Sequence, residues 1–120
     1  EAVAMSTMYA ANHLEGVKAI VALTESGTTP LLMSRISSGL PIFAMSPHNK
    51  TLAWTNLYRG VTPAMFDGDE TKPVYEVCRD ALDVLKAKGL VQSGDMVLLT
   101  HGDKMETVGS TNTCKVMMVE

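Results

Sequence analysis

The sequence of 120 residues lacks the features that identify membrane, nucleic-acid-binding and disulfide-rich proteins. No apolar run approaches the roughly 20 residues that a membrane helix needs, and no signal peptide is recognisable. A net charge of −3 gives no electrostatic basis for binding nucleic acid or an anionic membrane surface. The two cysteines, Cys78 and Cys114, have no metal-ligand spacing, which favours buried thiols in a reducing compartment for both over the alternative of a disulfide.

The glycine-rich nucleotide motifs are also missing. The chain has neither G-x-G-x-x-G nor G-x-x-x-x-G-K-[ST], which argues against a dinucleotide fold and a P-loop. The carboxylates Asp67, Asp69 and Glu70 lack the glycine and the distal glutamate of a calcium loop. No metal site is therefore expected.

What is present indicates one ordinary globular domain over residues 1–120. Apolar residues make up 46% of the chain and charged residues 19%, a balance typical of a packed core rather than disorder. Apolar runs without polar alternation, such as Ala19–Leu23, predict strands covered on both faces. Helices are expected over 2–13, 30–38, 50–57 and from Val74 to Gly89, and strands over 19–23, 42–45, 59–63, 96–99 and 114–119.

The alternation of strands and helices predicts an α/β fold with three layers, α/β/α. The simplest doubly wound order for a mostly parallel five-stranded sheet is 3-2-1-4-5. Because the last connection is too short for a helical crossover, strand 5 is expected to run antiparallel. The winding then reverses between strands 1 and 4, and ligands of such sheets bind beyond the carboxyl ends of the strands at this point.

The turn after the first strand is the strongest candidate site. Thr24-Glu25-Ser26-Gly27-Thr28-Thr29 joins a buried strand to a helix that is expected to begin at Pro30, with Thr29 as its N-cap. Free N–H groups and the helix dipole meet at such a turn. The hydroxyls of Thr24, Ser26, Thr28 and Thr29 add donors, so the turn is predicted to bind a phosphate.

A second polar loop, beginning at His101, is brought to the same place by the predicted topology. One alternative makes Ser26 a nucleophile with His101 as its base and Asp103 orienting the ring, as in a small hydrolase. Lys104 and Lys115 are the cations nearest this loop. Arg79 is expected to meet Asp83 on the exposed face of the longest helix.

Several motifs in order resemble the C-terminal domain of pyruvate kinase. They are Gly16–Val21 leading to Thr24–Thr29, Leu57–Pro63, Ser93–Val97 and Gly109–Thr113. The similarity spans the whole chain and is greatest to the bacterial type activated by AMP and sugar monophosphates. It implies a regulatory domain without catalytic residues, in a cytoplasmic homotetramer of glycolysis. The full enzyme would transfer phosphate from phosphoenolpyruvate to ADP, with Mg²⁺ and K⁺ bound in a catalytic barrel domain absent from this sequence.

The resemblance also implies roles for the two loops. Thr24 to Thr29 would bind the phosphate of a phosphorylated sugar or AMP-like effector. The loop from His101 to Gly109, including Gly102, Asp103, Lys104 and Thr107, would close over the sugar. Thr28 stands where many relatives have arginine, so the phosphate is expected to be bound less tightly. A purely structural oligomerisation domain is the remaining alternative.

Overall fold

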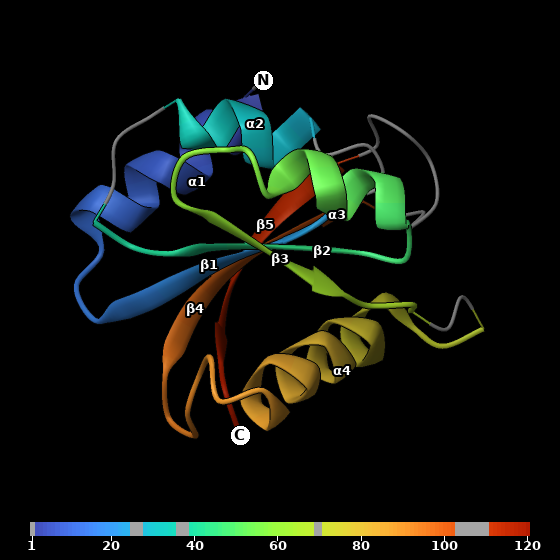
Figure 1. The fold of residues 1–120 in the computed structure, drawn as a ribbon. Helices are drawn as coiled ribbons and strands as arrows, with labels where there is room; N and C mark the ends of the chain where they lie inside the picture. Colours follow the sequence, from blue (N-terminus) through green and yellow to red (C-terminus); the bar gives the residue numbers. More distant parts are fainter. Residues whose placement is uncertain (1, 25–27, 36–38, 69–70, 103–110) are drawn as a thin grey trace.

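The computed structural model describes residues 2–24, 28–35, 39–68, 71–102 and 111–120 (Figure 1). The helices are α1 (Ala2–His13), α2 (Thr28–Ser34), α3 (Asn49–Thr55) and α4 (Val74–Ala87). The strands are β1 (Val17–Leu23), β2 (Ile42–Ser46), β3 (Val61–Met65), β4 (Met96–Gly102) and β5 (Thr111–Met118).

The sheet has the predicted order, β3-β2-β1-β4-β5. The central strand β1 is parallel to β2, with Ala22 opposite Ala44, and parallel to β4, with Ala22 opposite Thr100. The last pair, β4 and β5, is antiparallel, with Thr100 opposite Cys114. The prediction of a mixed sheet whose winding reverses between β1 and β4 is confirmed.

Helices cover both faces of this sheet, as predicted. Figure 1 shows α1, α2 and α3 on one face and α4 on the other. Alternate residues of β1 point to opposite faces, and both faces are buried: Ile20 and Ala22 pack with α1 and α2, whereas Val21 and Leu23 pack with α4. A strand enclosed in this way needs apolar residues at every position, which explains its sequence.

The helix α1 approaches the sheet closely because its inner side chains are small or flexible. Ala4 and Met8 are fully buried, and Ala11 is packed against the cluster to which they belong. Met33 of α2 completes the same cluster.

The helix α4 buries one stripe of side chains and exposes the other. Its buried residues recur at the predicted helical spacing: Val77, Cys78, Ala81, Leu82 and Leu85. After the helix, Gly89 has φ +76°, a conformation that glycine adopts without strain, and the N–H of Leu90 donates to the carbonyl of Leu85 at 3.0 Å.

Some predictions of the element boundaries are wrong. The helix α2 begins at Thr28, so Thr29 lies inside it rather than at its N-cap. Proline is tolerated throughout the first turn, where N–H groups lack intrahelical partners, and so Pro30 does not fix the start. The helix ends at Ser34, and residues 36–38 of the predicted helix lie outside the described residues.

The two cysteines have different environments. Cys78 is buried as predicted, but Cys114 is exposed, which corrects the prediction for that residue. On the edge strand β5, Lys115 and Met117 lie on one face, and Met117 points into the core beside α4. The opposite face of β5 is exposed, and Cys114 lies on it.

The buried thiol predicts a pH dependence of stability. Burial raises the pKa of the Cys78 thiol from its ordinary value of 9.0, and the charge of Lys115 opposes this with a smaller lowering. The folded chain therefore binds this proton more tightly than the unfolded chain. The resulting stability is complete below pH 9.0 and is lost as the pH rises through the folded-state pKa.

We expect Cys78→Ala to remove this contribution. In urea unfolding from about pH 8 to about pH 10, the free energy of unfolding should fall more steeply for the unmodified chain than for Cys78→Ala. Cys114→Ala is the matched control, because its thiol is exposed, and it should retain the steep fall. Parallel pH profiles for the unmodified chain and Cys78→Ala would contradict the assignment.

Candidate functional site

Buried hydroxyl groups gather where the central strands end. Thr24 follows β1, Ser46 ends β2 and Thr100 lies near the end of β4, and all three are buried. Thr24 and Ser46 share the face of Ala22 and Ala44 by alternation, and Thr100 shares it because it pairs with Ala22, so all three lie on the face that α1 and α2 cover. The backbone N–H of Thr24 donates to the carbonyl of Met45 at 2.9 Å, which fixes the end of β1 beside β2. The carboxyl ends of β1, β2 and β4 thus form one polar region.

The hydroxyls of Ser46 and Thr100 differ in their hydrogen bonding. The Oγ of Ser46 accepts a hydrogen bond from the N–H of His48 at 3.1 Å and so supports the turn into α3. The Oγ1 of Thr100 is fully buried and has no hydrogen-bond partner within the part of the chain that the structure describes. A buried hydroxyl left unsatisfied costs about 1–3 kcal/mol. Such groups are rare and often mark a functional region.

His101 lies in the neighbourhood that the topology predicts, but on the other face of the sheet. Its backbone belongs to β4, the strand next to β1. Its side chain is buried and lies on the same face of β4 as Val97 and Leu99, which pack against α4. The sheet therefore lies between its ring and the face that bears Thr24 and Thr100. This placement gives no support to His101 as a base for Ser26.

Other residues of the predicted site can be placed only in part. For Thr28 and Thr29 the structure gives the backbone, which forms the first turn of α2, and for Gly102 it gives the end of β4. Seven predicted site residues lie outside the described residues: Glu25, Ser26, Gly27, Asp103, Lys104, Thr107 and Gly109. What the structure brings together is the ends of the two strands that carry these loops.

Lys115 does not lie near the predicted phosphate turn. It is opposite Leu99 in the β4–β5 ladder and shares the α4 face, where its Nζ is 5.9 Å from the ring centroid of Tyr75. Its amino group therefore does not lie beside Thr24. A side chain of an edge strand alternates between faces, and Lys115 falls on the one opposite to Thr24.

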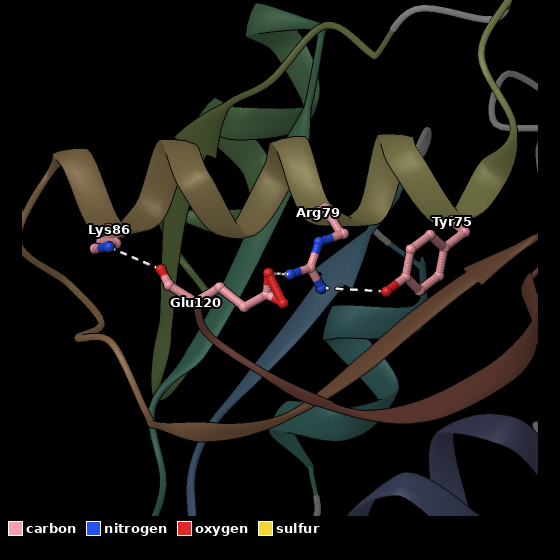
Figure 2. A network of polar contacts seen from close by, with 4 residues as sticks. All are labelled: Tyr75, Arg79, Lys86 and Glu120. Carbon is pink, nitrogen blue, oxygen red and sulfur yellow. Dashed lines mark hydrogen bonds and ion pairs between the residues drawn. The ribbon is translucent and has the colours of Figure 1, made fainter.

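The same face carries a network of polar contacts between α4 and the chain after β5 (Figure 2). Arg79 forms an ion pair with the carboxylate of Glu120 and donates to the hydroxyl of Tyr75 at 3.3 Å. Lys86 donates to the backbone oxygen of Glu120 at 2.7 Å. Helix spacing indicated Asp83 as the partner of Arg79, and no local signal in the sequence points to Glu120.

Within the described ranges, no group of three or more His, Cys, Asp or Glu side chains is arranged to bind a metal ion. None of the helices in those ranges is both long enough and apolar enough to cross a bilayer.

Comparison with known proteins identifies the family. Residues 1–117 match the family model described as "Pyruvate kinase, alpha/beta domain". "Pyruvate kinase II" of Salmonella typhimurium is 58% identical over 120 residues, which are all of this chain and 25% of that protein. The pyruvate kinase of Haemophilus influenzae is 52% identical over 120 residues, again the whole chain and 24% of that protein.

A pyruvate kinase of Buchnera aphidicola is 52% identical over 119 residues, or 99% of this chain and 24% of the relative. The chain thus spans about a quarter of the length of these curated relatives. A family match over nearly its full length agrees with the motifs and with the observed sheet order. The chain belongs to the pyruvate kinase alpha/beta domain family.

Proposed function

We propose that this chain is the regulatory domain of a cytoplasmic pyruvate kinase of glycolysis. The whole enzyme transfers phosphate from phosphoenolpyruvate to ADP, and its Mg²⁺, K⁺ and catalytic residues belong to a barrel domain outside these 120 residues. The domain itself binds a phosphorylated sugar or an AMP-like nucleotide and contacts another subunit of a homotetramer. Family membership supports the enzyme assignment, and the geometry of the sheet supports the two regulatory roles.

The observation that carries the effector site is the pairing of β1 with β4. Ala22 lies opposite Thr100, so the ends of the two strands that carry the two loops lie side by side. The loop from 25 to 29 supplies hydroxyl and backbone donors for a phosphate, and the loop from 101 to 109 supplies contacts to the sugar. Buried Thr24 and Thr100 give the floor between them a polar character that suits a ligand rich in oxygen atoms.

The absence of arginine at position 28 favours a monophosphate bound with modest affinity. One charge-assisted hydrogen bond contributes about 1.5–3 kcal/mol, which corresponds to roughly tenfold to a hundredfold in affinity. Threonine offers a neutral donor in its place. AMP, ribose 5-phosphate and glucose 6-phosphate are therefore better candidates than a sugar bisphosphate.

Calorimetric titration of the full-length enzyme with these three compounds tests the effector site. We expect at least one to bind, and we expect Ser26→Asp to weaken binding and activation by about tenfold or more, because its carboxylate repels the phosphate.

Ser93→Asp is the matched control for this titration. It adds the same charge at an exposed turn before β4, at the opposite end of that strand. It should bind the effector as the unmodified enzyme does. Failure of all three compounds to bind, or normal binding by Ser26→Asp, would contradict the proposed site and favour a structural subunit-contact domain.

The proposed subunit contact is the outer edge of β5. Within the described residues β5 pairs with β4 alone. Val119 directs its backbone toward β4, where its N–H donates to Asp95 at 2.8 Å and its carbonyl accepts from Gly94 at 2.7 Å. Since backbone groups of a strand alternate in direction, those of Cys114, Val116 and Met118 point to the open edge.

The side chains along this edge are suited to an interface. Val116 is 53% exposed and Met118 is 51% exposed, on the face opposite to α4. An edge with free backbone groups and exposed apolar side chains readily pairs with another strand. Antiparallel pairing of two β5 strands about a two-fold axis would satisfy the edge backbone groups of both copies, and each copy would use the same surface.

A proline at position 116 tests this contact. Val116→Pro removes an N–H that points away from β4, so the fold should persist while pairing with a second copy is lost. We expect sedimentation analysis of the full-length enzyme to show tetramers replaced by smaller species. Val116→Thr keeps the N–H and the branched shape and should remain tetrameric. A fully tetrameric Val116→Pro variant would rule out this edge.

A further inference from the structure

Tyr75, Arg79 and Lys86 of α4 contact Glu120 after β5 or one another (Figure 2). Lys115 of β5 lies near the ring of Tyr75 and completes this α4–β5 network. We propose that this α4–β5 network holds β5 in the position from which it pairs with a second copy, and that it makes assembly sensitive to ionic strength. The inference rests on the subunit contact proposed above.

The contacts of the network lie at both ends of α4. Near its beginning, two cations approach the ring of Tyr75, with the Cζ of Arg79 5.6 Å and the Nζ of Lys115 5.9 Å from its centroid. Near its end, Lys86 donates to the backbone oxygen of Glu120 at 2.7 Å. The helix and the strand therefore lie alongside each other and are joined at two separated points.

Arg79 connects these two points. One nitrogen of its guanidinium donates to the hydroxyl of Tyr75, and the other pairs with the carboxylate of Glu120. Its planar, fork-shaped group can serve both partners without changing its rotamer. Loss of the Glu120 charge would therefore release the chain after β5 and also loosen the orientation of Arg79 over Tyr75.

An edge strand needs such support more than an interior strand does. Among the residues that the structure describes, β5 is paired with another strand on one side only, and its exposed face carries Val116 and Met118. Met117 and Val119 are its buried anchors in the α4 core. Strands attached in this way open locally before the whole domain unfolds. The network adds contacts that oppose this local opening.

Solvent exposure makes these contacts respond to salt. The Glu120 side chain is 73% exposed and that of Arg79 is 27% exposed. Ion pairs in such positions are weak individually and are screened as ionic strength rises. Their effect is therefore expected on the local opening of β5 rather than on global unfolding, and it should be greatest at low salt.

Glu120→Gln in the full-length enzyme tests the proposal, because it removes the charge and preserves the shape. We expect hydrogen exchange of peptides covering residues 113–120 to become about three to ten times faster at low salt. The dissociation constant of the tetramer, measured by sedimentation, should rise by a similar factor. Both differences should disappear in about 0.5 M salt, where screening is nearly complete.

Asp80→Asn is the matched control. It breaks the ion pair between Lys72 and Asp80 of α4, whose charged atoms are 3.0 Å apart and whose side chains are 45% and 43% exposed, and Asp80 does not belong to the α4–β5 network. It should leave the exchange of β5 and the assembly unchanged. An equal effect of Asp80→Asn would show that the helix charge alone matters and would overturn the proposal.

The remaining outcomes separate this inference from the proposed function. If Val116→Pro dissociates the tetramer and Glu120→Gln changes neither exchange nor assembly, the network has no role and the subunit contact is retained. If Glu120→Gln speeds exchange while both variants remain fully tetrameric, β5 is not the contact, and the proposal fails together with that part of the function.

Discussion

The enclosure of β1 is the constraint on which the rest of the structure depends. Its apolar side chains on both faces require a layer of helices on each side, and its backbone requires a strand at each edge. Parallel pairing with β2 and β4 meets the second requirement. The winding of the chain must then reverse beside β1, where the ends of β1 and β4 lie together. The place of the candidate site is thus a consequence of how the core is built.

One strand separates the candidate effector site from the proposed subunit edge. Thr100 of β4 lies opposite Ala22 of β1 on one side and opposite Cys114 of β5 on the other. A change in the position of β4 would reach the edge strand through a single ladder of hydrogen bonds. Coupling of this kind requires an element with two arrangements. In the proposed coupling, β5 is that element, and its contacts with α4 favour its attached arrangement over its locally opened one.

Periodicity in the sequence predicted the fold because it depends on the average character of each segment. The positions of single side chains were harder to predict. Cys114 was predicted to be buried and is exposed, because a shift of one residue along a strand changes the face on which a side chain lies. Thr29 was misjudged because Pro30 is compatible with several positions in the first turn. The pairing of Arg79 with Glu120 joins residues far apart in the sequence, and no local pattern reveals it.

The distribution of charge separates the two proposed roles. Arg79, Lys86 and Lys115 all lie on the α4 side, engaged with Tyr75 and Glu120, whereas Thr24 and Thr100 face the other helices. With a net charge of −3, the domain offers no long-range attraction for an anion. An effector phosphate would depend on short-range hydroxyl and N–H donors, whose partly buried contacts salt screens little. Assembly through β5 would depend on exposed charges, so ionic strength would affect assembly far more than effector binding.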